Sequence, residues 1–89
     1  MTTKEKINYN MKIVSELLLK KNADYGDSAT NPRNIFAKGD ATQNICARID
    51  DKLARIENVG ICPETYDTID DLIGYLVLLK IAIDDKNEE

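Results

Sequence analysis

The chain has 89 residues, which fits one small domain, and its formal net charge of −4 argues against generic nucleic-acid binding, for which a basic surface is expected. It contains no histidine, so any catalysis has to use other side chains, and its two cysteines are too few for a disulfide framework. Because no signal segment and no apolar run of about 18 residues is present, we expect a cytoplasmic protein outside the membrane.

The first apolar-periodic segment predicts a helix from about residue 3 to 21. Thr2 and Glu5 have the spacing of a capping box, in which the two residues cap each other's backbone N–H groups. The apolar side chains recur every three or four residues and form one face, made of Ile7, Met11, Val14, Leu17 and Leu18.

A polar stretch from about residue 21 to 39 follows this helix. Residues 21 to 28 alone hold a lysine, an asparagine, two aspartates, a tyrosine, a serine and a glycine. A loop this long is unusual in a small domain unless it has a function. We therefore expect it to bind a small polar ligand, and we expect Ile35 and Phe36 to pin it onto the core.

Asp40 and Gln43 repeat the capping-box spacing and predict a second helix from residue 40 to about Asn58. Its apolar face is expected to carry Ile45, Ile49, Leu53 and Ile56. Pro63, which suits the first position of a helix, begins a third helix expected to run to about residue 84.

The third helix is the most apolar of the three. We expect its core face to hold Ile69, Leu72, Ile73, Leu76, Leu79 and Ile83. Its second half is apolar nearly all round, which is typical of a central helix or of a subunit interface. The sequence thus predicts a single all-α domain over residues 1–89, with three helices, a long polar loop between the first two, an acidic tail over residues 84–89, and assembly into a homo-oligomer through the third helix.

Polar side chains on the second helix extend the candidate ligand site. Arg48, Asp51 and Arg55 share a stripe beside its apolar face, which could also be a solvated surface of weak ion pairs. Arginine binds phosphate in a bidentate geometry, lysine adds a point charge, and tyrosine offers a surface for stacking. The sequence therefore predicts a site for a nucleotide or a nucleotide-derived molecule, formed by Lys21, Asn22, Asp24, Tyr25, Asn31, Arg33, Arg48, Asp51, Lys52 and Arg55.

Four segments carry a resemblance to a known family. They are Lys21-Asn22-x-Asp24-Tyr25-Gly26, Asn31-Pro32, Arg48-Ile49-Asp50-Asp51-Lys52-Leu53-x-Arg55-Ile56 and Asp67-Thr68-x-x-Asp71-Leu72-Ile73-Gly74-Tyr75-Leu76. Together they resemble the nucleotide modification associated domain 1 family of phages and bacteria, over residues from about 17 to 81. The resemblance implies a phage or bacterial protein with a role connected to nucleotides.

The last of these segments is also similar to the last helix of MazG-type all-α nucleoside triphosphate pyrophosphohydrolases. Those enzymes hold magnesium with acidic pairs spaced i, i+3 on two helices. Glu64, Asp67 and Asp71 can supply one pair, although acidic residues there also complement the helix dipole. Asp50 and Asp51 are adjacent and point about 100° apart, so the second pair is incomplete.

Two functions from different classes follow. In the first, a phage-type oligomer binds a nucleotide-derived signal and sequesters it without chemistry and without a cofactor, in the cytoplasm of the host cell. In the alternative, magnesium on the acidic set of the third helix serves hydrolysis of a nucleoside triphosphate. An interaction module is a third possibility, but it leaves the polar loop unexplained. We favour the first because the second acidic pair is missing.

Overall fold

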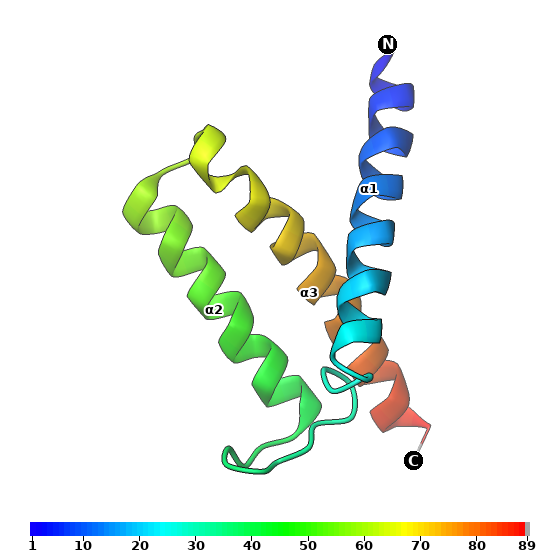
Figure 1. The fold of residues 1–89 in the computed structure, drawn as a ribbon, viewed down its shortest axis with the longest axis vertical. Helices are drawn as coiled ribbons and strands as arrows, with labels where there is room; N and C mark the ends of the chain where they lie inside the picture. The colour runs from blue at the N-terminus through cyan, green and yellow to red at the C-terminus, as the bar shows by residue number, and fades with distance from the viewer. Residues whose placement is uncertain (89) are drawn as a thin grey trace.

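The computed structural model describes residues 1–88 and contains three α-helices, with no strand among those residues. The elements are α1 (Thr3–Asp24), α2 (Ala41–Val59), the short 3-10 helix η1 (Pro63–Thr65) and α3 (Tyr66–Asn87). The predicted all-α fold, with its long loop between the first two helices, is confirmed (Figure 1). Glu89, the last residue of the predicted acidic tail, lies outside the described residues. No helix within residues 1–88 is both long and apolar enough to cross a membrane.

Both predicted capping boxes form and explain where α1 and α2 begin. The Thr2 hydroxyl accepts from the Glu5 N–H at 3.1 Å, and the Glu5 carboxylate accepts from the Thr2 N–H at 3.1 Å. Asp40 and Gln43 make the same reciprocal pair at 2.8 and 3.1 Å. These bonds satisfy backbone donors that have no partner within the helix. α1 and α3 each extend three residues beyond their predicted ends.

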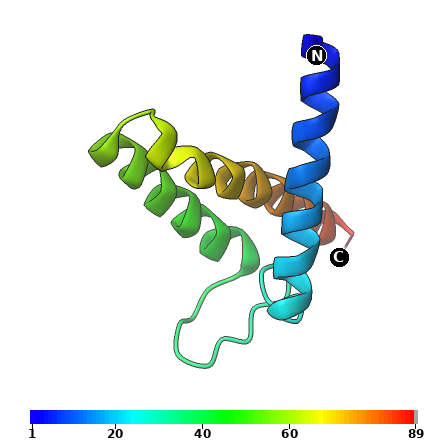
Figure 2. The ribbon, with the colours of Figure 1, turned by 45° about the horizontal axis from the view of Figure 1, so that its top comes forward.

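The three helices form an open arrangement rather than a closed bundle. α2 and α3 run antiparallel and pack along their length, joined by η1 (Figure 1). α1 crosses α3 and makes no backbone approach to α2 (Figure 2). The crossing is close because Gly74 of α3 has no side chain, so that a Cβ built there would lie 3.4 Å from Leu18 Cδ1 of α1. Gly74 therefore admits a close neighbour, and that neighbour is a helix.

The core is small and lies where α2 and the C-terminal half of α3 meet. Ile45, Leu78 and Ala82 form its buried cluster, and Val14 of α1 is buried as well. The predicted core face of α3 was wrong in part. Leu72, Ile73 and Leu79 are half-buried and Leu79 packs against the core, but Ile69, Leu76 and Ile83 are 38%, 51% and 46% exposed. The buried positions of this helix are Thr68, Gly74, Leu78 and Ala82. Because α3 is apolar nearly all round, neighbouring helices pack on the face whose small residues allow a close approach.

Two further expectations about apolar side chains were wrong. Ile35 and Phe36 do not pin the loop to the core, since they are 74% and 95% exposed. Their loop segment has no regular structure and leaves them at the molecular surface. Ile7 and Met11 of α1 and Leu53 of α2 are also exposed. No other element covers the part of α1 that carries Ile7 and Met11 (Figure 1).

Candidate functional site

A groove of about 960 Å³ separates α1 from α2, with α3 behind it. Gly74, Tyr75 and Leu78 of α3 line its floor. Leu17 and Leu18 contribute from α1, and the chain that leads from α1 to α2 closes one end. Its size falls within the range of small-molecule sites in proteins. The groove is therefore the candidate site, and it exists because α1 rests on α3 without reaching α2.

The groove brings together six of the ten residues predicted to bind a ligand. They are Lys21, Asn22, Asp24, Tyr25, Arg33 and Arg48. Sequence reasoning missed its apolar wall, to which Ile35 and Phe36 contribute, and its acidic neighbour Asp70. The signal for the wall was two apolar residues in an otherwise polar loop, which were interpreted as anchors.

The turn after α1 holds several of these side chains in place. Gly26 and Asp27 both adopt positive φ angles, 58° and 62°, so the chain reverses within two residues. The Asn22 amide donates to the Asp27 carboxylate at 2.6 Å, and the Arg33 guanidinium donates to the Gly26 carbonyl at 3.3 Å. Asn22 thus has a structural role in the turn, while Tyr25 at the end of α1 remains 71% exposed on the groove.

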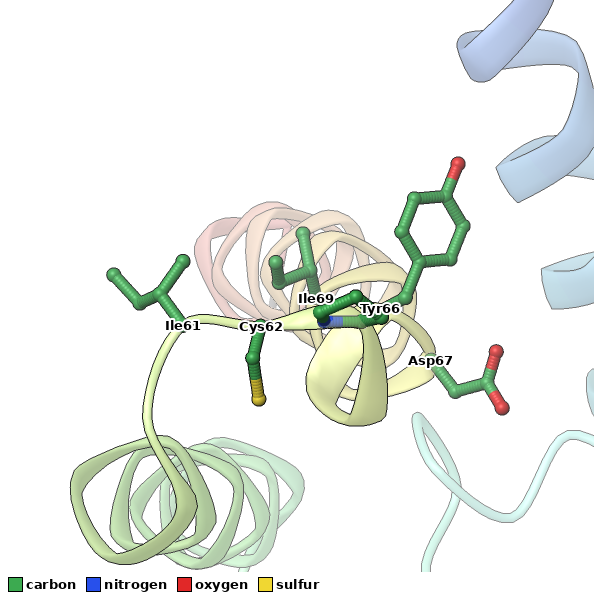
Figure 3. Close-up of a pocket in the computed structure, with 6 residues that line it drawn as sticks. Ile61, Cys62, Tyr66, Asp67 and Ile69 are labelled. Atoms are coloured by element: carbon green, nitrogen blue, oxygen red, sulfur yellow. The ribbon is translucent and has the colours of Figure 1, made fainter.

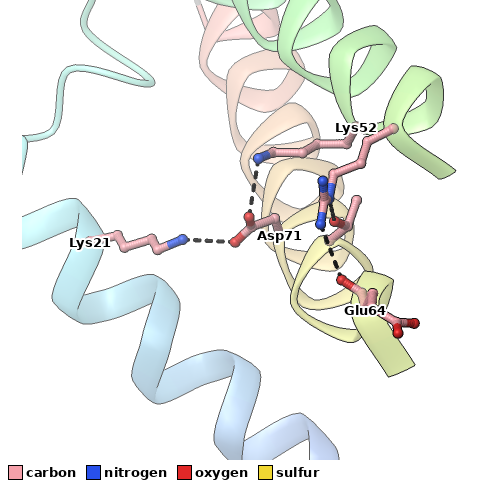
Figure 4. Close-up of polar contacts among 6 residues, drawn as sticks. Lys21, Lys52, Glu64 and Asp71 are labelled. Carbon is pink, nitrogen blue, oxygen red and sulfur yellow. Dashed lines mark hydrogen bonds and ion pairs between the residues drawn. The ribbon is translucent and has the colours of Figure 1, made fainter. Parts of the chain in front are cut away.

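Asp71 of α3 joins α1 and α2 across the floor of the groove. One of its carboxylate oxygens pairs with Lys21 Nζ of α1 at 2.7 Å, and the other pairs with Lys52 Nζ of α2 at 3.2 Å (Figure 4). Lysines from both other helices therefore contact the same side chain. Burial raises the pKa of Asp71, but hydrogen bonds from the two lysines outweigh it and the net pKa is lowered. The hydrogen bond to Asp71 likewise raises the pKa of Lys21.

Among the arginines, two remain available for a ligand and one does not. Arg33 and Arg48 line the groove and form no ion pair within residues 1–88. Arg55 lies away from the groove, where Nε donates to Thr68 Oγ1 at 3.0 Å and a terminal nitrogen donates to the Glu64 carbonyl at 3.2 Å. Arg55 therefore ties α2 to η1 and α3.

Four of the ten predicted residues do not line the groove, namely Asn31, Asp51, Lys52 and Arg55. Asn31 is exposed in the turn, where its N–H donates to the Asp27 carbonyl at 2.9 Å. Asp51 is exposed on α2, and Lys52 reaches the site only through its contact with Asp71. Arg48 and Arg55 do lie on one face of α2, but they are seven residues apart, which is about two helical turns along the axis.

The acidic set of the magnesium alternative does not converge. Asp71 is engaged by two lysines, the exposed Glu64 belongs to η1, and Asp67 borders a separate hollow at the turn between α2 and α3 (Figure 3). Within residues 1–88 no three carboxylates or thiols lie close enough to hold a metal ion. The hollow itself is lined mainly by apolar side chains such as Ile61 and Ile69.

No family model, curated protein or solved structure matches this chain. The similarity to the nucleotide modification associated domain 1 family stays a prediction from the sequence motifs.

Proposed function

We propose that this protein binds a nucleotide or a nucleotide-derived molecule in the groove between α1 and α2. The observation that carries the proposal is that Arg33 and Arg48, neither of which forms an ion pair within residues 1–88, line the same groove as the exposed Tyr25. A nucleotide has the matching parts, because its phosphates need cationic donors and its base needs an aromatic or apolar surface.

The phosphates are expected at the arginine end of the site. The Arg48 guanidinium makes no hydrogen bond or ion pair within residues 1–88, so it can bind phosphate without first breaking a protein contact. Arg33 has one terminal nitrogen on the Gly26 carbonyl and keeps its other N–H groups for a ligand. Lys21 and Lys52 add positive charge nearby, although Asp71 neutralises part of it. We therefore assign the main phosphate contact to Arg48 and a supporting one to Arg33.

The base is expected against the aromatic and apolar side of the groove. Tyr25 and Phe36 both line it and both are largely exposed, at 71% and 95%. Covering an exposed aromatic ring with a base buries apolar area from both partners and adds a stacking contribution of about 1–3 kcal/mol. Asn34 and Asn44 line the same groove and supply amides that can read the edge of a base.

Sequestration rather than catalysis is the activity that we propose. The resemblance to the nucleotide modification associated domain 1 family suggests a phage or bacterial origin, and a phage protein of this kind would act in the cytoplasm of its host. Binding a host immune signal without altering it needs a pocket but no catalytic carboxylates, and the carboxylates of residues 1–88 do not converge on a metal site. We further propose that the protein works as a homo-oligomer through α3, whose outward residues Ile69, Leu76 and Ile83 are exposed.

The test is an isothermal titration of the purified protein with nucleoside triphosphates, cyclic dinucleotides and ADP-ribose derivatives, with and without magnesium. Each mixture is then separated by chromatography to show whether the nucleotide is intact. We expect at least one nucleotide to bind and to be recovered unchanged. Magnesium-dependent release of pyrophosphate would instead support the pyrophosphohydrolase, and absence of binding across the panel would contradict a nucleotide site.

The matched variants are Arg48→Ala in the groove and Lys12→Ala outside it. Both remove one exposed cation from a helix, but only Arg48 lines the groove. Loss of a charge-assisted hydrogen bond costs about 1.5–3 kcal/mol, so Arg48→Ala should weaken binding by at least about tenfold while Lys12→Ala leaves it unchanged. Equal losses in the two variants would indicate a general charge effect rather than a site.

A further inference from the structure

The N-terminal half of α1, residues 3–12, stands away from the rest of the protein (Figure 1). We call this segment the arm. All of its residues are exposed, and in both views of the ribbon it projects past α3 (Figure 2). Within residues 1–88, its one side-chain hydrogen bond to another element is a long one, 3.5 Å, from the Tyr66 hydroxyl to Asn10. An isolated helix of this length is marginal in water, so the arm needs a packing partner to be stable.

The arm carries an apolar stripe that no part of the described chain covers. Ile7 and Met11 are 58% and 55% exposed. They continue, at spacings of four and three residues, the stripe of Val14 and Leu18 that packs on α3 further along the same helix. This alternation of three and four residues is the pattern by which helices pack side by side at a shallow angle.

The outer face of α3 offers a second uncovered stripe with the matching repeat. Ile69, Leu76 and Ile83 recur every seven residues and all three are exposed. Leu76 lies two residues from Gly74, or about 200° round the helix, and Gly74 is where α1 crosses. The arm of the same chain therefore lies on the wrong side of α3 to reach this face.

The exposed area of the chain is larger than that of a folded monomer of its size. The surface is 6924 Å² for 10.0 kDa, against about 5,200 Å² from the usual scaling of surface with mass. The radius of gyration is 14.5 Å, against about 12 Å for a compact chain of this length. If each of two chains buried its excess surface of about 1,700 Å² in a dimer, the total buried area would exceed the roughly 1,200–2,000 Å² that is typical of a stable interface.

The charges of the two surfaces are also complementary. Residues 3–12 contain three lysines and one glutamate, whereas α3 contains five aspartates and two lysines. An arm of net positive charge is thus attracted to a helix of net negative charge, and repulsion between two arms disfavours arm-to-arm pairing.

We propose that the protein forms a symmetric dimer in which the arm of each chain packs on the outer face of α3 of a second copy. The contact is reciprocal, since the Ile7 and Met11 stripe of one chain meets Ile69, Leu76 and Ile83 of the other, and the reverse contact forms around the same two-fold axis. This assembly gives the arm its missing partner and covers the exposed face of α3. It does not depend on the ligand, so its failure would leave the nucleotide-binding proposal untouched.

The test is the molar mass of the full chain by light scattering during size-exclusion chromatography. We expect the wild type to elute as a dimer. The arm variant Ile7→Glu/Met11→Glu and the face variant Leu76→Lys/Ile83→Lys should each be monomeric, because each places charges in the proposed interface. The control Asn8→Glu/Ser15→Glu adds two carboxylates to exposed positions of α1, about 70–90° round the helix from the centre of the stripe, and should remain a dimer.

A mixture of the two monomeric variants separates this arrangement from any other pairing. One of the two contacts in the mixed dimer is entirely wild type, and the other sets two glutamates against two lysines. We therefore expect mixing to restore a dimer, which also shows that both variants are folded. A monomeric wild type, an arm variant that stays dimeric, or a mixture that stays monomeric would each overturn the proposal.

Discussion

At the scale of single residues, Asp71 decides how the groove is built. It is the one side chain among residues 1–88 whose ion pairs reach both other helices, through Lys21 and Lys52. Asp71, Lys21 and Lys52 are all partly exposed to solvent. Their ion pairs therefore contribute about 1 kcal/mol to the free energy of unfolding, which is less than deeply buried ion pairs can contribute. Asp71 therefore sets the positions of α1 and α2 more than it sets the stability of the protein.

We predict that Asp71→Asn lowers the free energy of unfolding by about 1 kcal/mol near neutral pH, which corresponds to roughly 4–8 °C in melting temperature. The contribution has a defined pH window. Since the pKa of Asp71 in the folded state is lowered from its ordinary value of 3.8, its stabilisation is complete above about pH 5 and disappears as the pH falls through the folded value. At the alkaline side, the part of the stabilisation that comes from Lys21 is lost as the pH rises through the pKa of Lys21, which Asp71 raises above its ordinary value of 10.5.

Urea unfolding of the wild type and of Asp71→Asn over the acid range measures this window. The difference in free energy between the two proteins should be constant from about pH 5 to neutral and should vanish in strong acid. Asp51→Asn, which alters an exposed aspartate with no ion pair in the described residues, is the control and should match the wild type throughout. A difference that did not change with pH would show that Asp71 acts by shape and not by charge.

At the scale of the elements, the contact of α1 with α3 leaves room at Gly74 for a methyl group and for nothing larger. We predict that Gly74→Ala is neutral or stabilising by up to about 1 kcal/mol, because alanine favours the helix and its Cβ meets Leu18 Cδ1 at 3.4 Å, an ordinary contact distance. Gly74→Val adds two methyl groups at the same point and should destabilise the protein by about 1–3 kcal/mol through overpacking. Thermal unfolding of both variants distinguishes them, and a fully tolerated valine would contradict the close crossing.

The contact of η1 and α3 with α2 depends on Arg55. We predict that Arg55→Ala destabilises the protein by about 1–3 kcal/mol, because it leaves the buried Thr68 hydroxyl without its donor. The double variant Arg55→Ala/Thr68→Val removes both polar groups and should recover part of that loss. Denaturant titration gives the three values. If the loss of stability in the double variant equalled the sum of the losses in Arg55→Ala and Thr68→Val, the hydrogen bond between the two side chains would not stabilise the contact of α2 with α3.

Helix starts were predictable from the sequence because they depend on local chemistry. Thr2 with Glu5 and Asp40 with Gln43 cap their own helices, and each pair needs only four consecutive residues. Which face of α3 is buried was not predictable, because that helix is apolar on several sides and the choice depends on how Gly74 and Ala82 admit other helices.

The candidate site was predictable in part for the same reason. Residues close in sequence, such as Lys21, Asn22 and Tyr25, were grouped correctly on one groove. Arg48 and Arg55 share a helix face, yet only Arg48 lines the groove. Arg55 instead bonds to Glu64 and Thr68, which belong to η1 and α3. The sequence pattern of α2 cannot show where those two elements lie in space.

At the scale of the whole molecule, the chain has too small a core for the apolar surface that it carries. Four buried apolar residues stand against seventeen large exposed ones in the described part of the chain. Small domains with so little buried area are usually stabilised by assembly. The open shape and the exposed arm are therefore both consistent with the dimer that we propose.

We predict that the melting temperature of the wild type rises with protein concentration, because unfolding of a dimer releases two chains. The arm variant Ile7→Glu/Met11→Glu should melt at a lower temperature that does not depend on concentration. Differential scanning calorimetry over a wide concentration range measures both. A wild-type melting temperature that stayed constant would indicate that folding and assembly are not coupled.

The most direct test of the central claim, that the groove holds a nucleotide-derived ligand, compares two arginines on the same helix. The measurement is the Kd of the tightest nucleotide of the panel for Arg48→Ala and for Arg55→Ala, under conditions where circular dichroism shows both variants folded. Our account predicts a loss of at least about tenfold for Arg48→Ala and little change for Arg55→Ala, because only the first side chain lines the groove. Unchanged binding in Arg48→Ala, or a larger loss in Arg55→Ala, would contradict it.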